Sequence, residues 1–293
     1  MKNKNEFQVH FIGIGAEKAG TTQVSEMLTL HPEICMSEPK EVSFFNKTES
    51  YMQGGHNKHY GKGLEWYKKH FGHQKEGQIL GEFTTVYLYD KVAPKNIYEL
   101  YPDVKLIVCL RNPVERTFSQ YIMYRYFFQR EKRSFKEVIR QEKEFIDKSK
   151  YFEQISRYLQ YFKKEQMIFL SLEEIKTKPR ETMSRLYDFL GVKADFVPAN
   201  IKGKANAAKQ LRFPIVNRIT RITGEILADL NLSSWANYLK NMSIYQKFKQ
   251  ANSKKIEYPT IDQESKAYLQ SVFLEDIEQL ETLLNLNLSD WKL

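Results

Sequence analysis

Cysteine is scarce in this chain of 293 residues, which contains only Cys35 and Cys109. Both lie in apolar surroundings and have no paired spacing, so neither a disulfide framework nor a zinc-binding cysteine cluster is indicated. Glycine and proline are also modest, at 13 and 9 residues, which argues against a fibrous or low-complexity protein. With 42% hydrophobic and 28% charged residues, the composition is that of a soluble globular protein with a sizeable core.

Long hydrophobic runs are missing as well. No apolar run reaches the ~18 residues that a membrane span needs, and the short apolar run after the polar start is too brief for a signal sequence. We therefore expect a cytoplasmic protein without a transmembrane segment. The length favours a single domain over residues 1–293, and the net charge of +9 favours anionic partners without choosing among them.

Short apolar runs alternate with amphipathic patterns along the chain. Strands are predicted at 9–15, 79–83, 104–110 and 167–170, and helices at 21–30, 113–126, 179–190 and 263–284. This alternation predicts an α/β fold in which helices cover both faces of a parallel sheet. Residues 195–259 fit the pattern poorly, with weak helical signals at 215–230 and 235–248, and we interpret them as a helical excursion or lid over the sheet.

The first predicted turn between strand and helix reads GIGAEKAGTT, from Gly13 to Thr22. Glycines and small residues at the start of a helix let backbone N–H groups surround an anion, so this segment is predicted to bind a phosphate-like group. A dinucleotide fingerprint would need glycine at Lys18, and a Walker A loop would need lysine at Thr21, so neither motif fits. The predicted contacts come from five consecutive residues: Lys18, Ala19, Gly20, Thr21 and Thr22.

A second polar motif, R-x-P-x-x-R-x-x-S-x-Y, begins at Arg111, where the third predicted strand ends. Ser119 follows about two turns into the next helix, so both side chains are placed to converge on one anion beside the first loop.

Together these segments resemble the PAPS-dependent sulfotransferases, where PAPS is 3′-phosphoadenosine-5′-phosphosulfate. The resemblance rests on GAEKAGTT, the following Leu-His-Pro at 30–32, PKEVSFF at 39–45 and the motif from Arg111, and it is strongest to the heparan sulfate N-sulfotransferase and glucosaminyl 3-O-sulfotransferase branch. It implies a P-loop-like three-layer fold with a central parallel sheet, a 5′-phosphosulfate on the first loop and a 3′-phosphate on Arg111 and Ser119. It also implies adenosine 3′,5′-bisphosphate as product, no metal, and a carbohydrate or glycolipid acceptor.

Lys18 is expected to reach the bridging oxygen of the transferring group and to neutralise charge as that bond breaks. Two further residues receive catalytic roles through the resemblance. Glu82 ends the second strand and is similar in position to a catalytic glutamate of the heparan branch, which makes it the predicted general base. That branch continues with lysine, threonine and proline, whereas this chain has Phe83, Thr84 and Thr85, which weakens the expectation of a heparan-type acceptor. Lys40, followed by Glu41, is expected to face the transferring sulfate or the acceptor.

A basic segment inside the region 195–259 supplies three more predicted contacts, of which at least one is expected to reach the 3′-phosphate: Lys204, Lys209 and Arg212. A kinase-like phosphotransferase is disfavoured because no lysine follows Gly20 and no strand-end aspartate is offered to Mg²⁺. A basic nucleic-acid-binding module is disfavoured too, because the basic residues are dispersed along the chain and no aromatic–basic recognition motif occurs.

Overall fold

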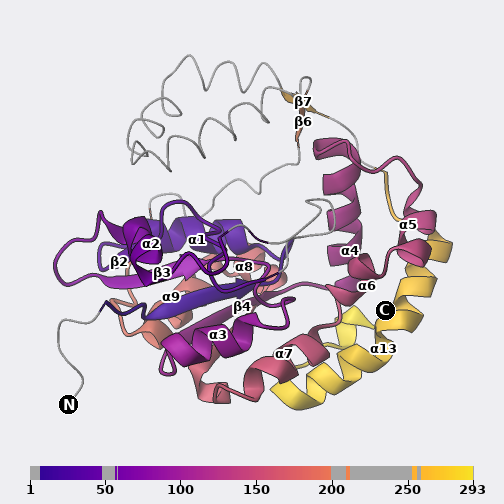
Figure 1. Cartoon of the computed structure of the whole chain (residues 1–293). Helices are drawn as coiled ribbons and strands as arrows, with labels where there is room; N and C mark the ends of the chain where they lie inside the picture. Colours follow the sequence, from indigo (N-terminus) through magenta and orange to yellow (C-terminus); the bar gives the residue numbers. More distant parts are fainter. Residues whose placement is uncertain are drawn as a thin grey trace.

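The structure is a computed structural model, and it describes residues 7–47, 57, 59–198, 209–211, 253–255 and 259–292. Its centre is a five-stranded sheet with the order β2-β3-β1-β4-β5, in which every neighbouring pair is parallel (Figure 1). The strands are β1 Phe11–Gly15, β2 Ile34–Met36, β3 Ile79–Phe83, β4 Lys105–Leu110 and β5 Met167–Ser171. Because parallel strands end at the same edge, the loops that follow them lie together at one side of the molecule.

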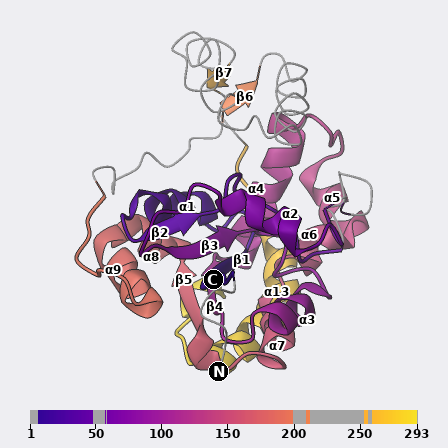
Figure 2. The same cartoon turned by 60° about the vertical axis from the view of Figure 1, so that its left-hand side comes forward.

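Helices cover both faces of this sheet (Figures 1 and 2). One face carries α1 Thr21–Leu30, α8 Leu172–Thr177 and α9 Pro179–Leu190, and the other carries α3 Ala93–Leu100, α7 Tyr151–Leu159 and α13 Gln263–Leu284. The Tyr187 hydroxyl donates to the carbonyl of Met27 at 3.3 Å and ties α9 to α1. This double cover explains why β1 is buried along its whole length and lacks the alternation of a half-exposed strand.

The other elements lie around this sandwich. They are α2 Leu64–Lys68, η2 Lys69–Phe71, α4 Pro113–Ile122, η3 Met123–Phe127, α5 Phe135–Gln141, α6 Lys143–Asp147, η4 Lys164–Gln166 and η5 Ser289–Trp291, together with the antiparallel pair β6 Lys209–Leu211 and β7 Ser253–Lys255. Helix α4 begins as its sequence predicts, because Pro113 occupies the first turn and the Asn112 side chain accepts from the amides of Val114 and Glu115.

Two glycines leave room for a large aromatic ring of the neighbouring strand, one on β1 and one on β3. Gly13 is paired with Phe83 and Gly81 with Phe11. A Cβ atom on Gly13 would lie 2.3 Å from the Phe83 ring, and one on Gly81 would lie 2.0 Å from the Phe11 ring. Any larger residue at either glycine would therefore displace the neighbouring ring and disturb the strand ends that carry the site.

The predicted parallel sheet and its flanking helices are confirmed, including the helix at 263–284. Strand β2 was not predicted, and the π-helical η3 continues α4 over residues expected to be α-helical. The helical signals predicted at 215–230 and 235–248 lie outside the described residues.

Candidate functional site

The loop from Gly15 to Gly20 joins β1 to α1 at the carboxyl edge of the sheet. Lys18 and Gly20 both have left-handed backbone conformations, with φ of 68° and 89°. A non-glycine residue in this region is uncommon, and such residues cluster at active sites and ligand-binding loops. Gly20 caps α1 without a side-chain acceptor, and the first turn contains no acidic residue. The amides at the start of α1 are therefore suited to bind an anion, as the sequence predicts.

Lys18 projects from this loop toward η3, where its amine lies 3.7 Å from the Met123 sulfur. Thioether sulfur is a weak acceptor, so the amine keeps donors for a ligand. Burial lowers the pKa of Lys18, Glu17 opposes that effect, and the neighbouring Arg111 and Arg116 lower the pKa further. A cation in such surroundings gains strongly from an incoming anion.

Arg111 adjoins the same loop. Its Nη1 donates to the carbonyl oxygen of Lys18 at 3.3 Å, and its Nη2 pairs with Glu115 at 3.0 Å. The two predicted anion-binding elements are thus in contact, although Lys18 and Arg111 are 93 residues apart in the chain. Ser119 is half-buried one turn beyond Glu115, on the same face of α4.

The remaining predicted donor contacts differ in exposure. Ala19 and Thr21 are buried, whereas Thr22 is exposed at the start of α1. Lys204 and Arg212 lie outside the described residues, and Lys209 is placed only as the first residue of β6. The roles of these three basic residues stay predictions.

Lys40 and Glu41 lie on the segment after β2 and reach the same edge. The Lys40 amine is 2.7 Å from Oε1 of Glu41 and 5.6 Å from the centre of the Phe83 ring. Oε2 of Glu41 accepts from the amide of Thr85 at 2.8 Å, so the carboxylate is anchored to the end of β3. Its side chain is nevertheless 39% exposed, and its backbone is left-handed with φ of 66°. Glu41 therefore presents a fixed, accessible carboxylate, a role that the sequence did not suggest for it.

Glu82, the predicted general base, has a different setting. It is 0% exposed, and its carboxylate accepts from the hydroxyls of Tyr67 at 2.7 Å, Thr84 at 3.0 Å and Tyr87 at 3.1 Å. Two of these hydroxyls, those of Thr84 and Tyr87, also accept hydrogen bonds from backbone amides of the segment after Glu41. Ser43 donates to Thr84, and both Phe44 and Phe45 donate to Tyr87. Glu82 thus holds the segment that carries Lys40 and Glu41.

The pH dependence of stability is expected to report on Glu82. Burial raises its pKa from 4.5 to about 7, against the opposing effect of the three hydroxyl donors. Because the folded protein binds this proton more tightly than the unfolded chain, the stabilisation is full below about pH 4.5 and is lost as the pH rises through 7. The shift corresponds to up to about 3 kcal/mol.

Glutamine has no such titration. We therefore expect the free energy of unfolding of Glu82→Gln, relative to that of the unsubstituted protein, to increase by up to about 3 kcal/mol as the pH rises from 5 to 8. Urea unfolding of both proteins at the two pH values measures this difference. An equal pH dependence of the two proteins would show that Glu82 is ionised at no cost to stability.

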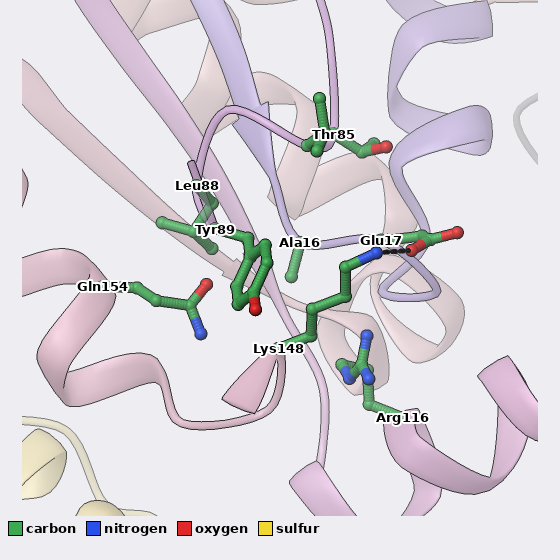
Figure 3. A pocket seen from close by; sticks show the side chains of 9 residues that line it. Ala16, Glu17, Thr85, Leu88, Tyr89, Arg116, Lys148 and Gln154 are labelled. Carbon is green, nitrogen blue, oxygen red and sulfur yellow. Dashed lines mark hydrogen bonds and ion pairs between the residues drawn. The ribbon is translucent and has the colours of Figure 1, made fainter. Parts of the chain in front are cut away.

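A third set of charges lines a narrow pocket: Glu17 on the loop itself, Arg116 on α4 and Lys148 at the end of α6 (Figure 3). Lys148 and Glu17 are 131 residues apart in the chain, so no local pattern announces their ion pair.

Among the residues that the structure describes, no helix is long and apolar enough to cross a membrane. The same part of the chain contains no group of three or more His, Cys, Asp or Glu side chains arranged to hold a metal ion.

The comparisons with known proteins agree on one family. The family profile described as "Sulfotransferase domain" matches residues 9–277. Human heparan sulfate glucosamine 3-O-sulfotransferase 6 is 29% identical over 195 residues, which are 61% of this chain and 51% of that protein. Mouse bifunctional heparan sulfate N-deacetylase/N-sulfotransferase 3 is 26% identical over 94% of this chain and 30% of its own length. The chain thus spans about half or less of these curated relatives.

A sulfotransferase from Alicyclobacillus acidocaldarius has a similar fold. Its crystal structure superimposes with a TM-score of 0.71 at 24% identity, covering 98% of this chain and 100% of the other. The likeness supports the three-layer architecture around the central parallel sheet.

Proposed function

This chain belongs to the sulfotransferase family, and on that premise we propose that it transfers a sulfuryl group from PAPS to a hydroxyl or amine of an acceptor. The observation that carries the proposal is the contact between the Arg111 guanidinium and the carbonyl of Lys18. The contact supports the proposal because the two predicted anion-binding elements lie side by side, as a nucleotide with phosphate at its 3′ position and phosphosulfate at its 5′ position requires.

The residues at this edge fit such a donor. The uncapped amides of α1, the Lys18 amine and the hydroxyls of Thr21 and Thr22 suit the 5′-phosphosulfate. Arg111 and Ser119 suit the 3′-phosphate, because a guanidinium and a hydroxyl provide fixed donors for phosphate oxygens. The donor supplies a sulfuryl group activated by its bond to phosphate. Lys18 is placed to neutralise the charge that develops on the oxygen leaving sulfur.

The acceptor must lose a proton as it attacks, which calls for a base at the same edge. Glu82 could contact an acceptor directly only after displacing the hydroxyl of Tyr67 or Tyr87, because its carboxylate is enclosed. Glu41 needs no such displacement. We assign the proton acceptor to Glu41, with Lys40 orienting its carboxylate, and we assign to Glu82 the support of the segment that carries them.

A carbohydrate or glycolipid is the proposed acceptor class, supported by the two relatives named for action on heparan sulfate. One experiment tests donor and acceptor together. The purified protein is incubated with PAPS that carries radioactive sulfur and with oligosaccharide, glycolipid or small phenolic acceptors. Labelled oligosaccharide or glycolipid is the expected product. Transfer from ATP with Mg²⁺ and none from PAPS would instead establish a phosphotransferase.

Arg111→Ala is expected to weaken binding of adenosine 3′,5′-bisphosphate by about ten- to a hundredfold, because charge-assisted hydrogen bonds contribute roughly 1.5–3 kcal/mol. Isothermal titration calorimetry measures the affinity directly. Glu115→Gln is the matched control, since it removes the ion pair of Arg111 and leaves the guanidinium in place. Unchanged affinity in Arg111→Ala would rule out Arg111 as the 3′-phosphate ligand.

A further inference from the structure

The side chain of Met123 lies against the lysine on which the proposed reaction depends most. Its sulfur is 3.7 Å from the Lys18 amine, although the two residues are 105 positions apart in the chain. Met123 is the first residue of η3, where α4 gives way to a π-helix, and such local changes of helix type are frequent at functional sites. The reaction proposed above makes no use of the thioether.

The same side of the helix carries other contacts with the candidate site. Glu115, Ser119 and Met123 follow one another at intervals of four residues, so they lie along one face of α4 and its continuation. Glu115 pairs with Arg111 at 3.0 Å, and the Arg111 guanidinium donates to the carbonyl of Lys18. Met123 therefore ends a row of side chains that faces the loop between β1 and α1.

Met123 is the most accessible sulfur in the part of the chain that the structure describes. Its side chain is half-buried, whereas both described cysteines are buried, and burial raises the pKa of each thiol and so disfavours the reactive thiolate. Four other methionines are described, and each is 6% exposed or less: Met27, Met36, Met167 and Met183. A small oxidant in solution should therefore react with Met123 before these other sulfurs.

Oxidation would change what this sulfur offers to the amine. A thioether is a weak acceptor, so the Lys18 amine keeps its hydrogen-bond donors for a ligand. A sulfoxide is polar and carries an oxygen acceptor on the same sulfur. From a sulfur 3.7 Å away, that oxygen can come within hydrogen-bond distance of the amine. Hydrogen bonds that involve an ionised group are roughly twice as strong as those between neutral groups.

We propose that Met123 is a site of reversible oxidation, at which a sulfoxide captures the Lys18 amine and suppresses transfer of the sulfuryl group. The oxidant is hydrogen peroxide. The sulfur lone pair attacks one peroxide oxygen, the O–O bond breaks as the S–O bond forms, and the other oxygen leaves as water with the proton of the first. Sulfur loses two electrons and the peroxide gains them, and a thiol-dependent methionine sulfoxide reductase reverses the step. The effect on turnover rests on the function proposed above, in which Lys18 contacts the 5′-phosphosulfate.

Peroxide treatment of the purified full chain tests the proposal. Peptide mass spectrometry of the treated, folded protein is expected to find sulfoxide at Met123 ahead of the four buried methionines. As Met123 is modified, kcat with PAPS should fall about ten- to a hundredfold, because a charge-assisted hydrogen bond must break before Lys18 can act. Methionine sulfoxide reductases A and B together should restore kcat. Earlier oxidation of a buried methionine, or a loss of kcat that the reductases do not reverse, would overturn the proposal.

Two variants separate Met123 from the other sulfurs. Met123→Leu keeps a similar volume without an oxidisable sulfur, so peroxide should leave its kcat equal to that of its own untreated sample. Met123→Gln places an amide oxygen at the same position, so it should reproduce the loss without peroxide and lose nothing more on treatment. The proposal is wrong if peroxide inactivates Met123→Leu as strongly as the unsubstituted protein, or if Met123→Gln is as active as Met123→Leu.

A further measurement does not depend on PAPS. Acetylation by a small anhydride, followed by mass spectrometry, compares the reactivity of Lys18 with that of Lys95, an exposed lysine on α3, in treated and untreated protein. Capture by the sulfoxide should slow the acetylation of Lys18 relative to Lys95. An unchanged ratio would count against capture even if PAPS is the donor. Slower acetylation of Lys18 in a protein that transfers nothing from PAPS would support capture and refute the proposed function instead.

Discussion

Replacing Lys18 with alanine is expected to reduce kcat by about 10²- to 10³-fold, the loss typical of removing one group that stabilises charge in a transition state. The lysine belongs to the loop that leads into the uncapped start of α1, and within the described part of the chain its amine contacts the Met123 sulfur, a weak acceptor. It therefore keeps its donors for the oxygen on which charge develops. Because this interaction strengthens as the bond to sulfur breaks, the loss should fall on kcat more than on KM.

The fold should survive this substitution. Alanine and lysine have similar costs at the left-handed φ of 68°, so the loop conformation is not favoured or disfavoured by the change itself. Lys95→Ala is the matched control, because Lys95 is an exposed lysine on α3 whose ion pair with Glu99 is 3.6 Å long. Initial-rate kinetics and thermal unfolding of both variants separate catalysis from folding. Turnover that remains normal in Lys18→Ala would remove this residue from the mechanism.

The fold was predictable where a local pattern is long enough to read. The buried runs of β3 and β4 and the repeating apolar face of α13 each carry the full period of their element. Strand β2 has only three residues, Ile34–Met36, and begins soon after α1 ends at Leu30; a run of that length does not show alternation. Its place at the edge of the sheet follows from pairing with β3, which is a long-range interaction.

The residues of the candidate site were likewise predictable only where a local motif marks them. Lys18 and Arg111 could be found from the sequence because each belongs to a compact motif at a strand end. The burial of Glu82 could not, since it depends on Tyr67 and Tyr87, which approach the strand end from separate segments. Glu17 and Lys148 were missed because charged residues in isolation resemble surface residues, and only the fold brings them together.

The second large effect concerns the two carboxylates near the end of β3, Glu41 and Glu82, either of which could be the general base. We expect Glu41→Gln to lower kcat by about 10²-fold or more, the loss typical of a missing general base. The amide keeps an oxygen acceptor for Thr85 and preserves the shape of the side chain, so the segment should stay in place. What disappears is the capacity to take a proton from the acceptor.

Glu82→Gln is the matched comparison, because Glu82 is the general base that the sequence predicts. In the folded chain, however, burial raises the pKa of Glu82 to about 7, so a neutral group already occupies this position at lower pH. A neutral amide there should reduce turnover less than the same change at Glu41, because it mainly alters the hydrogen bonds that hold Thr84 and Tyr87. Initial rates for both variants with saturating PAPS decide between the carboxylates. A 10²-fold loss in Glu82→Gln beside near-normal Glu41→Gln would return the base to Glu82 and require Tyr67 or Tyr87 to move when the acceptor binds.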